Sequence, residues 1–342
     1  MKPHEKQAPG APPAAVLHRV AIAGTGSYVP ERILTNAELE KMVETTDEWI
    51  VTRSGIRERH IARPEEATSD LAAVAARRAL ENAGMEADKL DLIIVATITP
   101  DMVFPNTACF VQKLIGARHA TCFGMEAACS GFVFAVETAS QYIRTGAAKT
   151  ALVIGAEKLS SITDWQDRST CVLFGDGAGA VVLRASDKEE GILSTITGSD
   201  GNLTELLNVP GGGSRHPTSR ETIENRMHYM KMAGKEVFKH AVRSMGDAAT
   251  RALAKAGMTI DDVALVIPHQ ANIRIIDAIR DRLGVVPEKF YVNLDRYGNT
   301  SAASVPLALD EAVRTGRVKT GDAVLLVAFG GGFTWGAMVI RL

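Results

Sequence analysis

The stretch from residue 79 to 95, ALENAGMEADKLDLIIV, recurs in altered form from residue 252 to 268 as ALAKAGMTIDDVALVIP. Gly84 and Gly257 occupy equivalent places in the two copies, at an offset of 173 residues (257 − 84). Apolar residues spaced by three and four predict a helix, the glycine predicts its end, and the Leu/Ile/Val run predicts a strand buried on both faces. The chain therefore contains a repeated unit of helix, glycine stop and strand.

A second repeated signal lies downstream of each copy. The tripeptide Arg-Thr-Gly ends at Gly146 and again at Gly316, an offset of 170 residues (316 − 146), and an apolar strand follows each time. Counting back through the preceding helix at this offset puts Cys129 opposite Asn299. We therefore expect two related halves that contribute side chains to a shared site.

Helices that alternate with Val- and Ile-rich strands indicate an α/β fold with largely buried sheets. The repeat divides it into a half from residue 18 to 185, which carries Cys129, and a half from residue 186 to 342, which carries His269 and Asn299. Residues 1–17, rich in Pro and Ala, are expected to be a disordered tail. The irregular Gly- and Pro-rich segment 200–226 is expected to border a substrate tunnel.

The composition limits the class of protein. The 342 residues are 46% hydrophobic, and a net charge of −2 gives no basic excess for nucleic acid. No stretch approaches the roughly 18 apolar residues of a membrane span, and no signal peptide is recognisable, so a cytoplasmic location is expected. The cysteines lack paired spacing, which argues against a disulfide framework and against a zinc site. They are Cys109, Cys122, Cys129 and Cys171.

Cys129 is the candidate nucleophile. It lies in Glu126-Ala127-Ala128-Cys129-Ser130-Gly131, directly before the helical periodicity of residues 132–143. A thiol at a helix N-terminus is close to unsatisfied backbone amides and to the positive end of the helix dipole, and both favour a thiolate. The other cysteines are better explained as small buried apolar side chains.

His269 and Asn299 are the candidate partners of the cysteine. His269 directly follows an apolar strand and Pro268, and Asn299 lies in Tyr-Gly-Asn-Thr shortly before a helical segment. The simpler alternatives are a polar strand end for the histidine and a helix cap for the asparagine. A cysteine with histidine and asparagine is typical of a peptidase or of an acyl-transfer enzyme, and the spacing does not choose between them.

Two glycine-rich segments invite comparison with ligand-binding motifs. Gly330-Gly331-Gly332 follows the last long apolar strand and predicts a tight turn, whose amides are suited to hold an oxyanion. Gly24-Thr25-Gly26 lacks the third glycine of a dinucleotide motif, and no GK[ST] occurs, so nucleotide chemistry is not expected.

Together these motifs resemble beta-ketoacyl-acyl-carrier-protein synthase III, the condensing enzyme that starts type II fatty acid synthesis, within the thiolase superfamily. The resemblance covers about residues 18 to 342. It rests on segments 46–59, 126–131, 174–180, 268–272, 298–304 and 329–336. It implies a five-layered αβαβα fold, a homodimer and a triad of Cys129, His269 and Asn299.

The resemblance also implies a reaction. Cys129 would take the acyl group of an acyl-CoA primer, while the backbone amides of Cys129 and Gly331 hold the oxyanion. Malonyl-acyl carrier protein would then lose CO2, and His269 and Asn299 would stabilise the enolate that attacks the acyl group to give 3-oxoacyl-acyl carrier protein. No cofactor is implied, because both substrates carry their own phosphopantetheine arm, and the long arm implies a tunnel.

Further binding residues follow from the same resemblance. The residues expected to bind coenzyme A are Thr45, Trp49, Arg53 and Arg168, with the adenine between Trp49 and Arg168. Phe104 is expected to reach across the dimer into the acyl pocket of the partner, which favours a short primer. The residues expected to dock the acidic carrier protein are Lys239, Arg274 and Arg282. Asp281 departs from the pattern, because some relatives carry a basic residue there.

Several rival functions remain open. Asn299 favours the initiating class over elongating condensing enzymes, which use a second histidine, and over thiolases, which use a second cysteine. Plant-type polyketide synthases also use Cys-His-Asn but extend from malonyl-CoA directly. A peptidase would need no CoA, and a noncatalytic scaffold would need only the fold.

Overall fold

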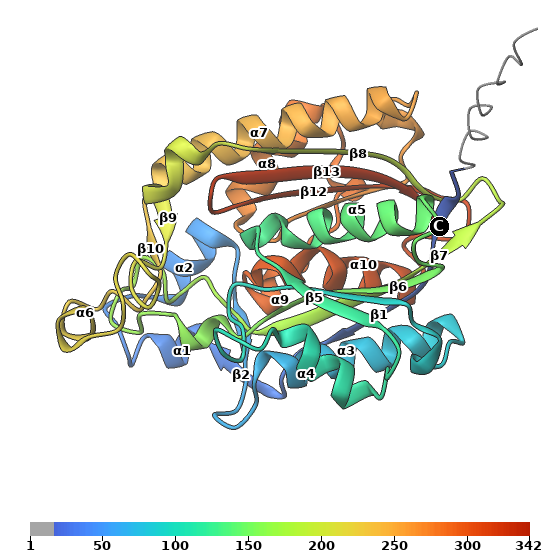
Figure 1. Cartoon of the computed structure of the whole chain (residues 1–342). Helices are drawn as coiled ribbons and strands as arrows, with labels where there is room; N and C mark the ends of the chain where they lie inside the picture. The colour runs from blue at the N-terminus through green and yellow to red at the C-terminus, as the bar shows by residue number, and fades with distance from the viewer. Residues whose placement is uncertain (1–16) are drawn as a thin grey trace, which may run out of the picture.

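The computed structural model describes residues 17–342, which form alternating layers of helices and sheets (Figure 1). Two outer helical layers enclose two sheets, and a third helical layer lies between the sheets. The expected five-layered αβαβα fold is therefore confirmed. The predicted N-terminal tail, apart from the exposed Leu17, lies outside the described residues.

The first sheet combines buried parallel strands with two antiparallel ones. Its strands are β1 (Arg19–Tyr28), β4 (Leu92–Ala96), β5 (Thr121–Met125), β6 (Thr150–Glu157) and β7 (Gly177–Ser186). Their order is β1-β7-β6-β4-β5, with β4 parallel to β5 and β6, and β7 antiparallel to β6 and β1. Every residue of β4 is buried, as expected for a strand covered by helices on both faces.

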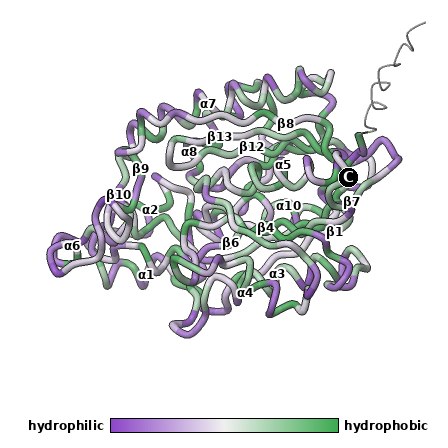
Figure 2. The backbone as a smooth tube through the Cα atoms, viewed as in Figure 1, coloured by the Kyte–Doolittle hydropathy of each residue, from purple (hydrophilic) through white to green (hydrophobic). Residues whose placement is uncertain are grey.

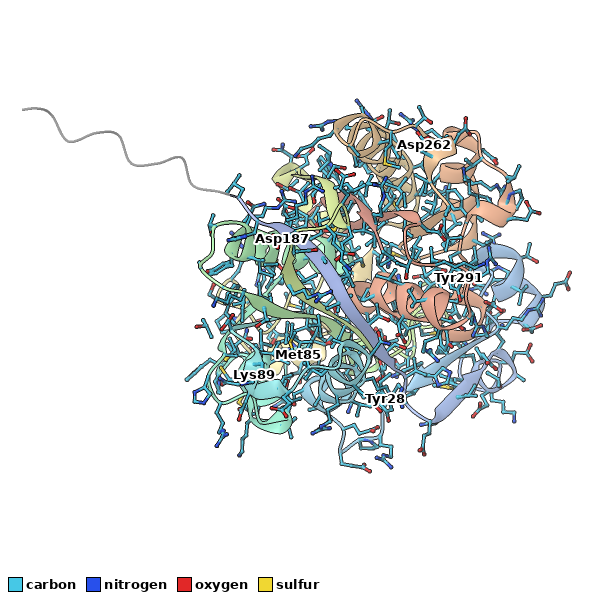
Figure 3. All side chains as sticks on the ribbon, turned by 90° about the vertical axis from the view of Figure 1, so that its right-hand side faces the viewer. Tyr28, Met85, Lys89, Asp187, Asp262 and Tyr291 are labelled. Carbon is cyan, nitrogen blue, oxygen red and sulfur yellow. The ribbon has the colours of Figure 1, made fainter. Side chains whose placement is uncertain are left out.

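The second sheet repeats this arrangement. Its strands are β8 (Gly191–Ser199), β11 (Leu265–Pro268), β12 (Ala323–Gly330) and β13 (Thr334–Arg341). The order β11-β12-β13-β8 mirrors β4-β6-β7-β1, with the parallel pair again followed by antiparallel neighbours. The turn between β7 and β8, where Figure 3 labels Asp187, connects the two sheets.

Helices cover both faces of each sheet, as Figure 1 shows. The outer helices are α3 (Thr68–Ala83) and α4 (Thr107–Ile115) on the first sheet, and α7 (Gly234–Lys255) and α8 (Ile273–Leu283) on the second. The central layer consists of α5 (Gly131–Arg144) and α10 (Ser304–Arg314). Figure 2 shows the apolar interior that these layers share. No helix within residues 17–342 has the length and apolar character needed to cross a membrane.

The glycine stops of the repeated segment are confirmed. Gly84 ends α3 and Gly257 follows α7, with φ of 60° and 68°, a left-handed conformation that glycine adopts without strain. Gly24 and Gly26 on β1 are required for a different reason, the close approach of a helix. A Cβ at either position would lie 2.6 Å or less from the backbone of Ala79 on α3. That motif therefore serves the close packing of helix on sheet.

Two excursions leave the layers at equivalent points of the repeat. Between β1 and α3 lie β2 (Arg32–Thr35), α1 (Asn36–Leu39), α2 (Asp47–Ser54) and β3 (Glu58–Ile61). Between β8 and α7 lie η4 (Gly201–Leu206), β9 (Leu207–Asn208), α6 (Arg220–Glu224) and β10 (Lys231–Met232). Both occupy the left-hand side of the molecule in Figure 1. The short turns elsewhere are η1 (Ala87–Lys89), η3 (Leu159–Ser161), η5 (Ile260–Asp262), η6 (Pro287–Lys289) and α9 (Leu294–Tyr297).

Near the predicted site, the two halves of the repeat align differently from the alignment expected from the sequence. The turn η2 (Ala128–Ser130) leads directly into α5, and η7 (Ser301–Ala303) leads directly into α10. Ala128 and Ser301, the first residues of these turns, both have positive φ, 44° and 48°. The local offset is therefore 173 (301 − 128), three more than the offset of 170 after the helices. The difference arises because α10, with 11 residues, is shorter than α5, with 14. Cys129 is opposite Ala302, and the expectation that it faces Asn299 in the repeat is wrong.

Candidate active site

One large cavity, of about 1220 Å³, runs from α2 to the turn that carries Cys129. Its wall includes Cys129, His269, Asn299 and Gly331, so the structure brings together all the predicted chemical groups. Residues of η4 and β9 also line it, which agrees with the prediction that segment 200–226 borders a tunnel. Within the described residues, no cluster of His, Cys, Asp or Glu side chains is arranged to hold a metal ion.

Cys129 is held at a sharp turn between β5 and α5. The positive φ of Ala128 reverses the chain, and the Ser130 hydroxyl donates to Ala127 O at 2.8 Å. The end of β12 packs directly on this turn, because a Cβ at Gly330 would lie 2.5 Å from Cys129 N. The side chain is only 8% exposed, and all four cysteines are free.

Burial decides the ionisation of Cys129 in the free protein. It raises the pKa of the thiol from its usual 9.0 to about 12, which corresponds to roughly 4 kcal/mol. A helix dipole contributes at most about 2 kcal/mol, so the expected preference for a thiolate is overridden by burial. The nearby carboxyl groups of Glu157 and Glu126 contribute to this raised pKa. The thiol therefore needs a proton acceptor when it reacts.

His269 directly follows β11 and is held by two other segments of the C-terminal half, β12 and α10. Its N–H donates to Val327 O on β12 at 2.7 Å, and its Nδ1 lies 2.6 Å from Ser304 Oγ, at the start of α10. Burial lowers the pKa of His269 to about 3, so the imidazole is neutral near pH 7. With Nδ1 occupied by Ser304, Nε2 is left for a substrate. Ser304 was not singled out from the sequence.

Asn299 is positioned by backbone bonds to the segment before β7. Its N–H donates to Leu173 O at 2.8 Å, and its carbonyl accepts from Gly175 N at 3.0 Å. The side-chain oxygen Oδ1 accepts the N–H of Ser301 at 2.9 Å. Because Oδ1 is engaged, the Nδ2 amide remains as a donor beside the cavity.

A buried carboxyl group near the cysteine was missed in the sequence. Glu157, the last residue of β6, is fully buried and accepts hydrogen bonds from Thr97 Oγ1 (3.0 Å), Thr99 Oγ1 (2.6 Å) and Ile98 N (3.1 Å). Burial raises its pKa to about 7. The available signal was the pair of polar residues at the carboxyl ends of adjacent buried strands, Thr97 after β4 and Glu157 on β6, since such ends often form ligand sites.

Trp49 and Arg53 of α2 line the cavity. The guanidinium carbons of Arg53 and Arg168 each lie 5.1 Å from the centroid of the Trp49 ring. Arg168 also donates to Glu44 O at 2.7 Å. Among the described residues, neither Arg168 nor Thr45 belongs to the cavity wall, and Thr45 Oγ1 is buried without a hydrogen-bond partner. Because Arg168 already contacts the Trp49 ring, an adenine can lie between them only if Arg168 moves.

The predicted docking residues are exposed on α7 and α8. Lys239 lies on α7, and Arg274, at the start of α8, also lines the cavity. Arg282, at the end of α8, forms an ion pair of 2.5 Å with Asp247 of α7. Asp281 pairs with Arg280 at 3.1 Å. The basic surface is therefore partly neutralised by its own acidic side chains.

Phe104 lies outside the cavity of its own chain. It is 82% exposed and belongs to an apolar loop between β4 and α4. Its neighbours Met102 and Val103 line the cavity, although Val103 is 91% exposed. Exposed apolar clusters of this kind are typical of contacts with another protein surface.

A repeated five-layered α/β fold that brings a cysteine, an imidazole and a carboxamide into one long cavity defines the class of thiolase-like condensing enzymes, which are acyltransferases. The family model of 3-oxoacyl-[acyl-carrier-protein (ACP)] synthase III matches residues 123–201. A second model, of the C-terminal part of the same family, matches residues 253–342. Over 322 residues the chain is 58% identical to the beta-ketoacyl-[acyl-carrier-protein] synthase III of Desulfitobacterium hafniense (strain DSM 10664 / DCB-2), covering 94% of this chain and 97% of that one. The chain therefore belongs to the 3-oxoacyl-[acyl-carrier-protein] synthase III family.

Solved structures show the same relationship. The 3-oxoacyl-[acyl-carrier-protein] synthase III of Aquifex aeolicus VF5 is 50% identical, with a TM-score of 0.89 over 94% of this chain and 100% of that chain. The priming beta-ketosynthase of the R1128 polyketide pathway is 37% identical, with a TM-score of 0.89 over 98% of this chain and 99% of that chain.

Proposed function

We propose that this protein condenses a short acyl-CoA primer with malonyl-acyl carrier protein to give 3-oxoacyl-acyl carrier protein, CO2 and CoA, the first condensation of fatty acid synthesis. The observation that carries the proposal is the convergence of Cys129, His269 and Asn299 on one cavity in a chain of the synthase III family. No cofactor enters this scheme, because each substrate brings its own phosphopantetheine thioester.

In the first half-reaction, the Cys129 sulfur attacks the acyl thioester and coenzyme A leaves. The backbone amides of Cys129 and Gly331 are the proposed donors to the tetrahedral oxyanion. The close packing of Gly330 on Cys129 N supports this, because it brings the end of β12 against the cysteine turn. Loss of one such donor typically raises the barrier by about 3 kcal/mol.

In the second half-reaction, malonyl-acyl carrier protein loses CO2 and the resulting enolate attacks the acyl group on Cys129. The enolate oxygen needs uncharged donors in a water-excluded site, and two are at hand. Asn299 offers Nδ2, since its Oδ1 is engaged by Ser301 N. His269 is neutral and offers Nε2–H when the Ser304 hydroxyl donates to Nδ1.

Substrate binding and assembly form the outer part of the proposal. Coenzyme A enters past Trp49 and Arg53, with Arg168 and Thr45 closing on the nucleotide. The proposed enzyme is a cytoplasmic homodimer in which Phe104 enters the acyl pocket of the partner, and its exposure supports this. The proposed docking residues for the carrier protein are Lys239, Arg274 and Arg282.

We place the boundary between the two halves at residues 185 and 186. The strands of the first sheet end at Ser186, one residue past this boundary, and those of the second lie between Gly191 and Arg341, which supports the division to within a residue. In this division the N-terminal half supplies the nucleophile, and the C-terminal half supplies the imidazole and the carboxamide.

A second candidate is the priming of a polyketide pathway by the same chemistry. The similarity to the R1128 priming ketosynthase, at 37% identity and near-complete coverage, favours its consideration. The two candidates differ in the carrier protein that the enzyme accepts. Turnover with the fatty acid carrier protein and with a polyketide carrier protein distinguishes them.

The proposed function is tested by incubating the protein with a panel of acyl-CoAs, from acetyl to medium-chain and branched. Intact-protein and peptide mass spectrometry should find an acyl group on Cys129, and Cys129→Ala should show none. The size of the preferred acyl group identifies the primer. If no acyl-CoA modifies Cys129, the proposed first half-reaction is wrong.

A further inference from the structure

We propose that Glu157 is a positioning and proton-accepting residue for Cys129, and that the Ser301 hydroxyl carries the proton between them. This inference rests on the proposed acyl transfer through Cys129. It assigns a role to a buried carboxyl group and a buried hydroxyl that the half-reactions above do not use.

The turn η7, which begins with Ser301, packs on both β6, which ends at Glu157, and η2, which carries Cys129. Ser301 lines the cavity together with Cys129 and is only 1% exposed. Its Oγ has no hydrogen-bond partner among the described residues, and the hydroxyl acts to lower the pKa of both Cys129 and Glu157. A buried hydroxyl without a partner is costly, so an unpartnered one in an active site indicates a functional contact.

The backbone holds Ser301 in place. Its N–H donates to Asn299 Oδ1 at 2.9 Å, and its φ of 48° is a strained conformation for a residue with a side chain. The turn η7 that begins with Ser301 packs on η2, the turn that carries Cys129. Strained residues at turns of this kind are concentrated at functional sites. Ser301 therefore contacts the Asn299 carboxamide through its N–H and belongs to a turn that packs against the cysteine turn.

Glu157 is prepared to accept a proton. Its carboxylate is oriented by donors from Thr97, Ile98 and Thr99, and its pKa of about 7 places it near the working pH of a general base. The charged groups that act on the Cys129 thiol are Glu157 and Glu126, both carboxyl groups.

His269 is the other candidate acceptor of the thiol proton. It has a pKa of about 3, so imidazolium is strongly disfavoured in its buried position. Transfer of the thiol proton to Glu157 also neutralises the carboxylate as the sulfur becomes charged. The negative charge that would disfavour the thiolate is thereby removed.

The proton and electron pairs balance over the cycle. In acylation, the S–H bond of Cys129 breaks, its proton passes to Ser301 Oγ, and the Ser301 proton passes to a Glu157 oxygen. The thiolate then forms the bond to the acyl carbon, and coenzyme A leaves with the electron pair of its C–S bond and is protonated by solvent. When the enolate takes the acyl group, the Cys129 thiolate is released and recovers the proton from Glu157 through Ser301.

The test measures the first half-reaction alone, with acetyl-CoA as the probe and no carrier protein. Formation of acetyl-Cys129 is followed by rapid quenching and intact mass from about pH 6 to about pH 9, because a general base shows its ionisation in the rate profile. The variants are Glu157→Gln, Ser301→Ala and Thr99→Val. The matched control is Glu137→Gln on α5, whose carboxyl group accepts from Gln141 outside the cavity.

In the unchanged protein the acylation rate should rise with pH through a transition near pH 7. Glu157→Gln and Ser301→Ala should lose that transition and acylate about 100-fold more slowly, the scale of general-base catalysis. Glu137→Gln should match the unchanged protein. Thr99→Val should shift the transition to higher pH, because the carboxylate loses a donor. A merely structural role of these residues would not move the pH profile.

An unchanged rate and profile in Glu157→Gln would overturn the relay. If that variant does not fold, an unshifted transition in Thr99→Val overturns it instead. Absence of acetyl-Cys129 in the unchanged protein would refute the proposed function itself, so the two failures are distinguishable.

Discussion

His269 Nδ1 and Ser304 Oγ lie 2.6 Å apart, which joins the end of β11 to the first residue of α10. Ser304 Oγ also accepts the N–H of Gln270 at 3.3 Å. An oxygen that already accepts one bond is well placed to donate its own proton to Nδ1. The proton of the neutral imidazole is then on Nε2, as the proposed enolate stabilisation requires.

Ser304→Ala should therefore impair malonyl decarboxylation more than self-acylation. Without the hydroxyl, the ring can carry its proton on Nδ1 and present an acceptor to the enolate. We expect CO2 release from malonyl-acyl carrier protein to be about 10- to 100-fold slower, comparable to the loss of part of an oxyanion site. Acylation by acetyl-CoA should stay within a few-fold of the normal rate. Ser140→Ala on α5 is the control, because within residues 17–342 its hydroxyl bonds only to Glu137 O. Equal loss of both half-reactions would contradict the tautomer argument.

Asn299→Asp should strongly slow decarboxylation while retaining the local backbone geometry. One carboxylate oxygen can still accept the Ser301 N–H, but the Nδ2 donor becomes a second, negatively charged acceptor facing the enolate. CO2 release should fall by about 10²- to 10³-fold or more. Asn82→Asp is a matched control, because Asn82 Oδ1 also accepts a backbone N–H, that of Thr25, away from the cavity. A decarboxylation rate like that of the control would show that Nδ2 does not contact the enolate.

The fold was largely predictable because its determinants are local. The glycine stops at Gly84 and Gly257 and the apolar strands that follow predict the repeat, and the structure confirms it, since the order β4-β6-β7-β1 of the first sheet recurs as β11-β12-β13-β8 in the second. The register at the active-site turn was not predictable, since it depends on the shorter α10.

The site was predictable only in part. Cys129, His269 and Asn299 could be found because each lies where an apolar strand ends or a helix begins. Ser304 could not, because its contact with His269 joins segments that only the packed layers bring together. Glu157 could be noticed as a polar residue at the end of a buried strand, but the sequence does not show which groups it contacts. The ionisation of Cys129 was predicted in the wrong direction, since a helix N-terminus is visible in a sequence but the depth of burial is not.

The pH dependence of stability should reveal the raised pKa of Glu157. Its carboxyl group binds a proton below about pH 7 in the folded state and below pH 4.5 when unfolded, so this group lowers the free energy of unfolding as pH rises between these values. The loss amounts to about 3 kcal/mol at most. Glu157→Gln should remove this contribution. Urea unfolding of both proteins at about pH 5 and about pH 8 measures the difference, and parallel pH dependence in the two would contradict the raised pKa.

Gly330→Ala should disrupt the cysteine turn. The added Cβ would lie 2.5 Å from Cys129 N and 3.0 Å from the Cβ of Ala128, so the backbone of β12 or of η2 must move. We expect acylation of Cys129 to fall by about 10²-fold or more, because catalytic geometry tolerates little displacement. Gly201→Ala should leave the rate unchanged, because a Cβ there meets no atom of the described part of the chain within 4 Å. The measurement is the rate of acyl-Cys129 formation, followed by mass spectrometry. A normal rate in Gly330→Ala would show that the cysteine turn can shift without loss of activity.

Arg274→Ala should weaken carrier-protein docking more than Arg282→Ala. Both arginines lie on α8, but Arg282 is paired with Asp247, so part of its charge is already neutralised within the protein. We expect KM for malonyl-acyl carrier protein to rise about 10-fold for Arg274→Ala and about 2-fold for Arg282→Ala, with the larger effect diminished by salt. Asp247→Asn should lower KM, because it releases Arg282 for the acidic partner. Acylation by acetyl-CoA alone should be unchanged in Arg282→Ala and Asp247→Asn. Equal KM effects of the two arginine substitutions would mean that the Arg282–Asp247 pair opens on docking at little cost.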